Sequence, residues 1–270
     1  MIAYPNAKIN LGLNVVRKRT DGFHDLETIF YPIPLRDILE IIPNQENRIR
    51  FSSSGIEIPS SKGGNLVEKA VHLIKQDFDV PFVDVHLHKQ IPIGAGLGGG
   101  SADAAFALKL LNELFELKIS VQQLESYAGH LGSDCPFFIK NQPVFAQGKG
   151  DEFTAIDFSL KDKYLVLIYP AIHVSTALAY SGVAPELSLH DLQAAIQQPM
   201  LTWKNTVKND FEASVFVKFP LLKELKEMLY DKGAFYACMS GSGSSIVGVF
   251  NEKPAIQLAD HFSSWILKLD

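Results

Sequence analysis

The chain has 270 residues, a formal net charge of −5, and 47% hydrophobic residues. This composition supports a sizeable core in one large or two modest domains, and the lack of a long single-sign charge block argues against nucleic-acid binding. The longest apolar run, residues 164–169, is far too short for a membrane span, and the N-terminal segment lacks the features of a secretory signal. We therefore expect a cytoplasmic protein that contacts neither membranes nor nucleic acid, with Cys135 and Cys238 as buried thiols.

The first half of the chain shows strand and helix patterns in turn. Apolar residues at every second position predict a strand over residues 7–15, and Asp21-Gly22 predicts a turn into a second strand over 23–33. Further elements are expected in this order: strands at 37–43 and 48–59, a helix at 65–78, a strand at 82–91, and helices at 102–117 and 121–131.

The second half begins after a stretch rich in turn residues at 142–157. A boundary near residue 150 divides the chain into the expected domains 1–150 and 151–270. The later elements are expected in this order: a strand at 164–169, helices at 174–182, 189–198, 209–219 and 220–233, two strands around a small-residue loop at 240–245, and a final helix. Strands and helices mixed without regular βαβ alternation favour an α+β fold.

The stretch "PIGAGLGGGSADAA" at residues 92–105 holds five glycines between Gly94 and Gly100. A dinucleotide-binding turn would need an acidic residue at the end of the next strand, but Glu113 and Glu116 lie in a helical pattern. A Walker A loop would need a lysine before Ser101, where Gly100 stands. A plain tight turn would need only one or two glycines.

The remaining interpretation is a cradle for phosphate groups. Glycines allow backbone N–H groups to approach a bulky anion, and the free N–H groups and dipole at the start of a helix favour negative charge. Ser101 is expected at the N-cap, where its hydroxyl could cap the helix, bind phosphate, or bind Mg²⁺. The loop therefore predicts a site for a di- or triphosphate.

Three stretches in order resemble the motifs of the GHMP kinases, the superfamily of galactokinase, homoserine kinase and mevalonate kinase. They are "NAKINLGLNVVRKRTDGFHDLETIF" at 6–30, "PIGAGLGGGSADAA" at 92–105 and "MSGSGSSIVGVF" at 239–250. The resemblance covers essentially the whole chain. It implies a two-domain α+β fold, with a ribosomal-protein-like N-terminal domain, a ferredoxin-like C-terminal domain, and ligands in the cleft between them.

The same resemblance implies an activity and its cofactors. "RTDGFHDLET" and "GSDCPFF" are similar to members that phosphorylate a hydroxyl on the erythritol part of a cytidyl-diphosphate substrate, in non-mevalonate isoprenoid biosynthesis. ATP and Mg²⁺ are implied, with Ser101 as the one metal-contacting residue. No acidic Mg²⁺ ligand stands out in the sequence. Another GHMP kinase of small molecules, and a nucleotide-binding protein without activity, remain as alternatives.

Residue by residue, the resemblance assigns roles to matching positions. Lys8 and Asp134 match the catalytic pair, since a carboxylate can take the proton of the attacking hydroxyl and an ammonium can steady the transferred phosphoryl group. The implied ATP-binding residues are Pro92, Ile93, Gly94, Ala95, Gly96, Leu97, Gly98, Gly99, Gly100, Ser101, Ala102 and Asn65.

The substrate-binding positions implied are Asn10, Phe23, His24, Thr176 and Tyr180. His24 matches a residue that contacts the edge of the cytosine, and Tyr180 matches an aromatic residue that stacks on it. Phe23 stands where many members have tyrosine, so stacking would survive and a hydroxyl contact would be lost. Four of the assigned residues have a structural alternative. Lys8 could be a solvated lysine of the strand, Asp134 could form the turn before Cys135-Pro136, His24 could lie on the surface, and Tyr180 could belong to a helix core.

Overall fold

The computed structural model describes residues 1–59, 64–183, 185, 191–258 and 261–270. These residues fold into two compact units, each assembled from separate stretches of the chain. Unit 1 contains Met1–Ala7, Leu35–Ile93 and Gly98–Gln142, and unit 2 contains Lys8–Pro34, Gly94–Leu97 and Pro143–Asp270. The expected division into sequential domains at residue 150 stays a prediction.

Unit 1 contains a four-stranded sheet in the order β1-β4-β6-β5. Its strands are β1 (Ile2–Ala3), β4 (Ile38–Pro43), β5 (Arg50–Gly55) and β6 (Val83–Lys89). β6 pairs antiparallel with β4 and parallel with β5. Its side chains alternate between buried and half-buried, because one face of the sheet packs on helices and the other does not.

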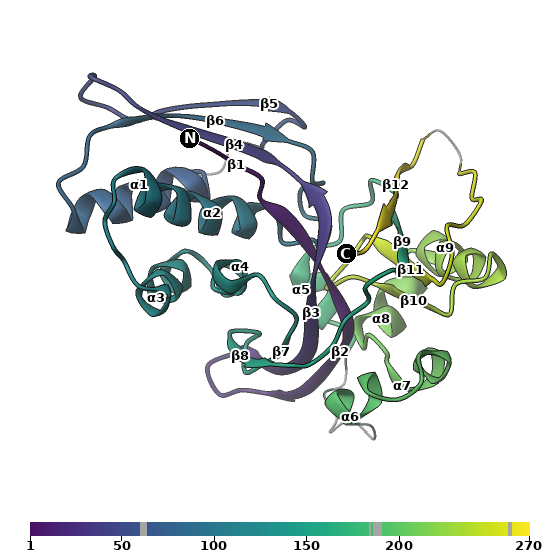
Figure 1. The fold of residues 1–270 in the computed structure, drawn as a ribbon. Coiled ribbons are helices and arrows are strands. Elements are labelled where there is room, and N and C mark those ends of the chain that lie inside the picture. The colour runs from purple at the N-terminus through teal and green to yellow at the C-terminus, as the bar shows by residue number, and fades with distance from the viewer. Residues whose placement is uncertain (60–63, 184, 186–190, 259–260) are drawn as a thin grey trace. The chain divides into compact units, whose positions relative to one another are not determined.

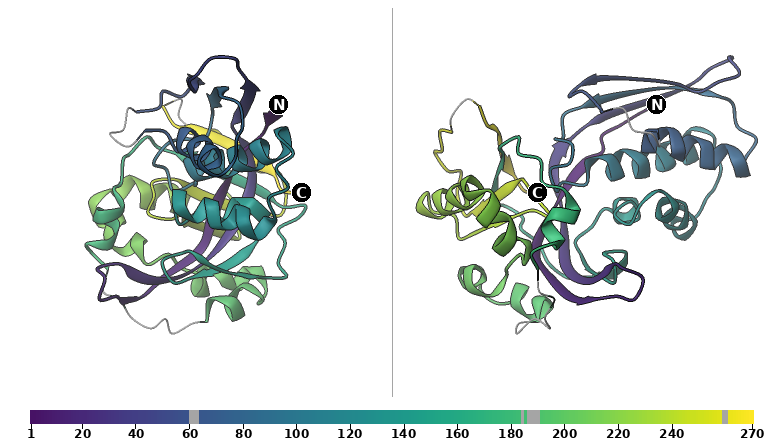
Figure 2. Two further views of the ribbon diagram at one scale, coloured as in Figure 1. Left: turned by 90° about the vertical axis from the view of Figure 1, so that its left-hand side faces the viewer. Right: turned by 180° about the vertical axis from the view of Figure 1, so that it is seen from behind.

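The helices of unit 1 lie on the side of that buried face, with α3 and α4 packed on α1 and α2. They are α1 (Leu66–Asp77), α2 (Gly99–Leu114), α3 (Val121–Leu131) and the short α4 (Phe137–Lys140). In Figures 1 and 2, α1 and α2 run side by side across one face of the sheet. α1 and α3 each begin with a complete capping box, from Asn65 and from Ser120.

A second sheet has the order β2-β3-β7-β8, with β2 (Asn6–Lys18), β3 (His24–Arg36), β7 (Val144–Gln147) and β8 (Glu152–Ala155). β2 confirms the predicted first strand, but its residues from Asn6 to Val15 are buried on both faces. Residues 142–157, expected to be mainly turns, instead contain the hairpin of β7 and β8. Val144 and Phe145, which lie in β7, are buried.

The third sheet, in unit 2, has the order β10-β11-β9-β12. Its strands are β9 (Tyr164–Tyr169), β10 (Tyr236–Met239), β11 (Ile246–Phe250) and β12 (Ser263–Lys268). The predicted final helix is wrong, because β12 pairs antiparallel along β9. Trp265 and Leu267 are half-buried while their neighbours are exposed, and this period of two is typical of a strand.

The helices of unit 2 are α5 (Thr176–Tyr180), α6 (Leu192–Ile196), α7 (Trp203–Thr206), α8 (Phe211–Lys218) and α9 (Pro220–Asp231), with a 3₁₀ turn at Met200–Thr202. Residues 189–190 of the expected helix at 189–198 lie outside the described residues. Leu222 and Leu229 of α9 join Val166 of β9 and Ile246 of β11 in one buried cluster.

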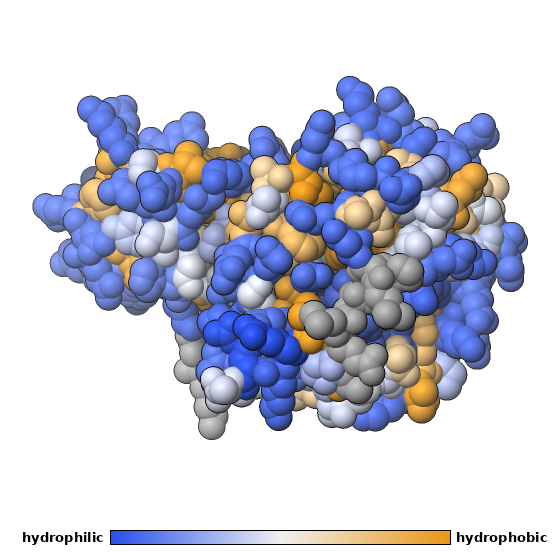
Figure 3. Space-filling model, turned by 90° about the horizontal axis from the view of Figure 1, so that it is seen from below, coloured by the Kyte–Doolittle hydropathy of each residue, from blue (hydrophilic) through white to orange (hydrophobic). Residues whose placement is uncertain are grey.

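The face of the molecule in Figure 3 is mainly hydrophilic, with apolar residues among the polar ones. No helix in the described part of the chain has the length and apolarity that a membrane span needs. Cys135 and Cys238 are buried free thiols, as the sequence predicted.

Candidate active site

Lys8 is a buried cation on β2, with a side chain only 4% exposed. A solvated strand lysine, the structural alternative, is therefore wrong. Its Nζ donates a hydrogen bond to Asn10 Oδ1 at 2.6 Å and lies 4.3 Å from the centroid of the Phe30 ring. Burying an ammonium is costly unless polar or aromatic groups surround it, so the fold holds this charge in a fixed place.

Asn10 links Lys8 to the loop at residues 240–245. Its Nδ2 donates to Thr28 Oγ1 at 2.9 Å, and its backbone N–H donates to Ser240 Oγ at 3.2 Å. Ser240 Oγ in turn donates to the carbonyl of Gly96 at 2.9 Å. Within unit 2, the first and third motifs and the start of the glycine-rich loop are therefore joined by hydrogen bonds. Thr28 was not a sequence candidate, because a threonine in a strand carries no signal of its own.

Two of the expected base-binding residues lie together. The rings of His24 and Tyr180 stack with centroids 4.5 Å apart and planes 19° apart. Tyr180 also contacts the ring of Phe211 edge-to-face at 4.8 Å. Thr176 is exposed at the first position of α5.

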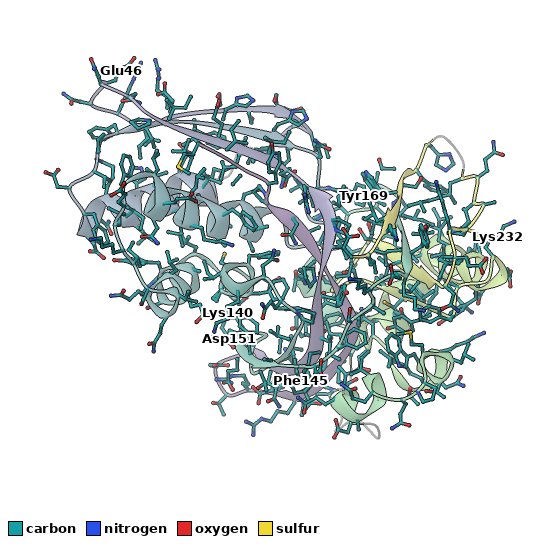
Figure 4. The ribbon with its side chains drawn as sticks, in the orientation of Figure 1. Glu46, Lys140, Phe145, Asp151, Tyr169 and Lys232 are labelled. Carbon is teal, nitrogen blue, oxygen red and sulfur yellow. The ribbon has the colours of Figure 1, made fainter. Side chains whose placement is uncertain are left out.

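Phe23 is 59% exposed in the turn before β3. The Lys149 ammonium lies 5.3 Å from its ring centroid. Lys149 is held 3.8 Å from Asp151, which Figure 4 labels between β7 and β8. An exposed aromatic ring with a cation on it can accept a stacked base without losing core packing.

Three glycines of the loop are required by backbone conformation. Gly94, Gly96 and Gly98 have φ of +66°, +78° and +69°, a region that other residues seldom adopt. Gly96 is constrained twice, because a Cβ there would lie 2.0 Å from the carbonyl oxygen of Ser240.

The other two glycines differ from these and from each other. A Cβ on Gly99 would lie 2.8 Å from Ile91 Cγ2 and 2.9 Å from Lys89 Nζ, so packing excludes a side chain. A Cβ on Gly100 would meet no described atom within 4 Å. Gly100 lies in the first turn of α2, where glycine weakens a helix relative to alanine. The chain's own packing therefore gives no reason for glycine at this one position.

The start of α2 leaves its backbone N–H groups without a side-chain cap among the described residues. Its N-cap is Gly98, so the predicted N-cap role of Ser101 is wrong. The helix begins earlier than expected because Gly98 turns the chain in the left-handed region and Gly99 and Gly100 follow in helical conformation. α2 has 16 residues and no acidic residue in its first turn, so its positive end is uncompensated by that turn.

Asp134 lies half-buried in the turn between α3 and α4, inside unit 1. The next residue, Cys135, has a thiol whose pKa is raised to about 11 by burial, while its hydrogen bond with the Ser101 hydroxyl acts in the opposite direction. This contact brings the start of α2 and the Asp134 turn together within one unit. Cys135 itself is a neutral packing residue at physiological pH.

Asn65 has a structural role in unit 1 that the sequence did not predict. Its side chain accepts from the Val67 N–H at 2.8 Å as the N-cap of α1. Its predicted contact with a nucleotide base stays a prediction.

A buried charge cluster behind the glycine-rich loop was missed by sequence analysis. Lys89 Nζ bridges Asp37 and Asp103, at 2.8 Å from Asp103 Oδ2, and Asp37 Oδ1 accepts from the N–H groups of Gln90 and Ile91. Burial raises the pKa of Asp103 to about 7; Lys89 opposes this, but Asp37 shares that ammonium and raises the pKa further. The sequence offers no signal for this cluster, because its members lie far apart in the chain, between β3 and β4, at the end of β6 and in α2.

Comparison with known proteins places these features in a family. The model of the GHMP kinases N terminal domain matches residues 65–146, and that of the GHMP kinases C terminal domain matches residues 185–266. A 4-diphosphocytidyl-2-C-methyl-D-erythritol kinase of Bacteroides fragilis is 53% identical over 96% of both chains, and one of Chlorobium limicola is 38% identical over 92% of this chain and 87% of its own.

Solved structures support the same fold. A crystal structure of 4-(cytidine 5'-diphospho)-2C-methyl-D-erythritol kinase superposes with a TM-score of 0.84 at 30% identity, over 100% of this chain and 99% of the other. The mevalonate kinase of Methanococcus jannaschii superposes with a TM-score of 0.70 at 12% identity, over 100% of this chain and 98% of its own, and so shares the fold. The predicted two-domain α+β kinase fold is confirmed.

Proposed function

The chain belongs to the GHMP kinase family, and on this premise we propose that it transfers the γ-phosphoryl group of ATP to a hydroxyl of 4-diphosphocytidyl-2-C-methyl-D-erythritol, in non-mevalonate isoprenoid biosynthesis. Relatives about half identical over nearly the whole chain carry the name of this kinase. The structural observation that carries the nucleotide part is the uncapped start of α2 with the open position at Gly100.

In this proposal the phosphates of ATP lie at residues 94–102. The N–H groups of Gly99, Gly100 and Ser101 are the first donors of α2, and an anion is the partner that such donors and the helix dipole favour. The missing side chain of Gly100 lets a phosphate oxygen reach the backbone, which accounts for a glycine that packing does not require.

Mg²⁺ fits this arrangement as part of the nucleotide complex. The described residues contain no cluster of three histidine, cysteine or acidic side chains, and Mg²⁺ in kinases is held largely by phosphate oxygens and waters. The Ser101 hydroxyl, on the first turn of α2, would supply a protein oxygen. The ion would neutralise charge on the transferred phosphoryl group.

Asp134 and Lys8 supply the chemistry. Asp134 would accept the proton of the attacking hydroxyl. Lys8, desolvated and directed by Asn10, would stabilise the negative charge that develops on the phosphoryl oxygens. A buried ammonium is effective in this role because little water screens it.

The cytosine would stack between Phe23 and Tyr180, with His24 at its edge. This arrangement requires the His24 ring to leave its stacked position on Tyr180. Asn10 and Thr176 would contact other parts of the substrate. Stacking tolerates different bases, whereas a hydrogen bond to the base edge distinguishes them, so His24 would carry the preference for cytosine.

The test is a phosphotransfer assay with the cytidyl substrate, its uridyl analogue, homoserine and mevalonate. We expect turnover of the cytidyl substrate alone, and erosion of the cytosine preference in His24→Ala without a change in ATP affinity. Phe23→Tyr is the matched control, because it keeps the ring and should be nearly silent. Turnover of homoserine or mevalonate in place of the cytidyl substrate would overturn the proposal while leaving the family intact.

Asp134→Asn tests the catalytic role separately. The variant should keep its fold and its ATP affinity and lose about 10²–10⁴-fold in kcat, the usual contribution of a positioned acid–base group. Near-normal turnover in the folded variant would remove Asp134 from the mechanism.

A further inference from the structure

Residues 209–212, Asn-Asp-Phe-Glu, precede and begin α8 and contact three other parts of unit 2. The sequence predicted only a helix there. In the structure the backbone first runs beside β2, where the Leu13 N–H donates to the Lys208 carbonyl at 2.8 Å and the Asp210 N–H donates to the Leu13 carbonyl at 2.9 Å. The Asp210 side chain also accepts from the Val15 N–H at 2.7 Å. The segment is therefore fixed to the strand that carries Lys8.

Asn209 and Glu212 hold the turn that follows β10. Asn209 is 3% exposed, and its Nδ2 donates at 2.8 Å to both the Met239 and the Gly241 carbonyl. Glu212 accepts from the Met239 N–H at 2.8 Å and pairs with Lys226. The buried Asn209 side chain and the half-buried Glu212 side chain thus hold the backbone on both sides of Ser240.

Ser240 passes this constraint to the catalytic lysine. Its hydroxyl accepts from the Asn10 N–H and donates to the Gly96 carbonyl, and Asn10 accepts from Lys8 Nζ. A shift of the turn at 240–241 would therefore move the groups that orient the Lys8 ammonium.

Phe211 connects the same segment to Tyr180, one of the residues proposed to bind the base. It is 2% exposed and contacts the Tyr180 ring edge-to-face at 4.8 Å. α8 and α5 also meet closely, since Ser214 Oγ donates to the Ala179 carbonyl at 3.1 Å and a Cβ on Gly182 would lie 2.3 Å from Ser214 Cβ. Tyr180 can therefore keep its orientation only if Phe211 keeps its place.

We propose that residues 209–212 are positioning residues that set two parts of the active site independently: Asn209, through Ser240, sets Lys8 for phosphoryl transfer, and Phe211 sets Tyr180 for the nucleoside base. The inference rests on the proposed function, because it takes Lys8 and Tyr180 as site residues. It differs from a general stabilising role in predicting separate kinetic defects from adjacent residues.

The experiment compares steady-state kinetics of Asn209→Asp and Phe211→Leu with wild type, normalised to folded protein. Asn209→Asp keeps the acceptor for the Phe211 N–H but loses both donated hydrogen bonds. We expect kcat to fall by about 10²-fold, as for a small misplacement of a catalytic group, with both KM values little changed. Phe211→Leu should raise KM for the cytidyl substrate roughly two- to tenfold and leave kcat and KM for ATP nearly unchanged.

Leu160→Ala is the control for lost stability. Leu160 is fully buried in unit 2 and lies outside the cluster that contains Phe211, so this variant should unfold more easily with unchanged kinetics per folded molecule. If Asn209→Asp does not fold, Asn209→Ala replaces it without adding a buried charge. The inference would be overturned if Asn209→Asp and Phe211→Leu lost stability as Leu160→Ala does and kept wild-type kinetics. It would also be overturned if the two variants showed the same change in kcat and in KM for the cytidyl substrate.

The outcomes also separate this inference from the proposed function. Wild-type turnover of the cytidyl substrate decides the function by itself. If wild type phosphorylates another alcohol, the function falls and the Phe211 effect on cytidyl binding falls with it. The Asn209 effect on kcat is then measured with that alcohol and still decides whether the segment positions Lys8.

Discussion

The chain has two loops of small residues, at 94–100 and at 240–245, that look alike in sequence and differ in structure. Ser240, Ser244 and Ser245 are fully buried, and the Ser240 and Ser244 hydroxyls donate to backbone carbonyls. The first loop ends in an exposed glycine, Gly100, whose absent side chain contacts nothing described. Small residues allow close packing in the second loop. In the first loop they pack closely at Gly96 and Gly99 and leave space at Gly100.

Each loop also has one unsatisfied polar atom nearby. Asp103 Oδ1 and Ser245 Oγ are the buried side-chain atoms that lack a hydrogen-bond partner within the part of the chain that the structure describes. One belongs to a charge cluster and the other to a neutral hydroxyl, so their energetic consequences should differ in size. The number of glycines thus says little about the role of a loop, whereas the atoms that a side chain would meet say much more.

The largest effect is expected for Gly96→Ala, because Gly96 is a residue of the first loop that contacts the second. Its Cβ would lie 2.0 Å from the Ser240 carbonyl oxygen, and its φ is +78°. We expect a loss of about 3–5 kcal/mol in the free energy of unfolding, from backbone strain plus displacement of the second loop. The measurement is denaturant unfolding.

Gly22→Ala is the matched control for Gly96→Ala. Gly22 has φ +86° in the β2–β3 turn, and a Cβ there would meet no described atom within 4 Å. Strain without a clash should cost about 1–2 kcal/mol. Equal costs at the two positions would show that the contact between the loops contributes nothing.

Asp103→Asn should have the next largest effect, and its sign depends on pH. The pKa of Asp103 is about 7 in the folded protein against 3.8 ordinarily, so the folded state binds the extra proton between these values. The stability from this group is complete below pH 3.8 and is lost as pH rises to 7, at up to about 1.4 kcal/mol per pH unit. The asparagine variant should lack this decline and be more stable than wild type at pH 8.

Unfolding free energies from pH 5 to 8 check this expectation. The exposed Asp231→Asn is the control and should follow the wild-type curve. A variant less stable than wild type at pH 8 would mean that Asp103 is an ionised partner of Lys89 and contributes favourably as a charge.

Local patterns predicted much of the fold. The period-two alternation at 7–15, the Asp21-Gly22 turn and the apolar spacing at 65–78 depend on neighbouring residues, and the strand, the turn and the helix that they predict are all present. The prediction of a final helix is wrong because Trp265 and Leu267 belong to a short alternation, which becomes a strand only by pairing with β9. The prediction of Ser101 as the N-cap is wrong because α2 begins three residues earlier, with Gly98 as its N-cap.

Candidate site residues could be proposed from the sequence only where a motif marks them. Lys8 and the glycines match motifs of the family. Lys8 and Asn10 lie two residues apart in a strand, so they share one face of it. Asp37, Lys89 and Asp103 come together only through the sheet and α2, and Asn209 meets Met239 across the chain. Such contacts depend on tertiary packing, which no local spacing records.

Gly100→Ala is expected to have a smaller effect on stability, with opposite signs for folding and for binding. Alanine should stabilise α2 by about 0.5–1 kcal/mol, because it favours the helix and meets no described atom. ATP affinity should fall roughly tenfold, the loss of one hydrogen bond to a charged group. Thermal unfolding and nucleotide titration measure the two effects.

Gly98→Val would also be expected to weaken ATP binding. Because Gly98 has a φ of +69°, that effect would combine backbone strain with blocked access of phosphate to the backbone. Gly100→Ala adds no such backbone strain, because Gly100 is in helical conformation. Unchanged ATP affinity in a stabilised Gly100→Ala would remove the phosphate cradle from the first loop and end the contrast between the two loops.

Ser245→Ala should have the smallest effect. Its hydroxyl is buried with no hydrogen-bond partner among the described residues, so its removal should leave the unfolding free energy unchanged or raise it by up to about 1 kcal/mol. Ser240→Ala is the matched comparison, because that hydroxyl donates to Gly96 and accepts from Asn10, and its loss should cost about 1–3 kcal/mol. Denaturant unfolding and turnover are measured for both. If Ser245→Ala instead lost turnover while keeping its stability, its hydroxyl would be directed at a ligand, and the second loop would share the role that we assign to the first.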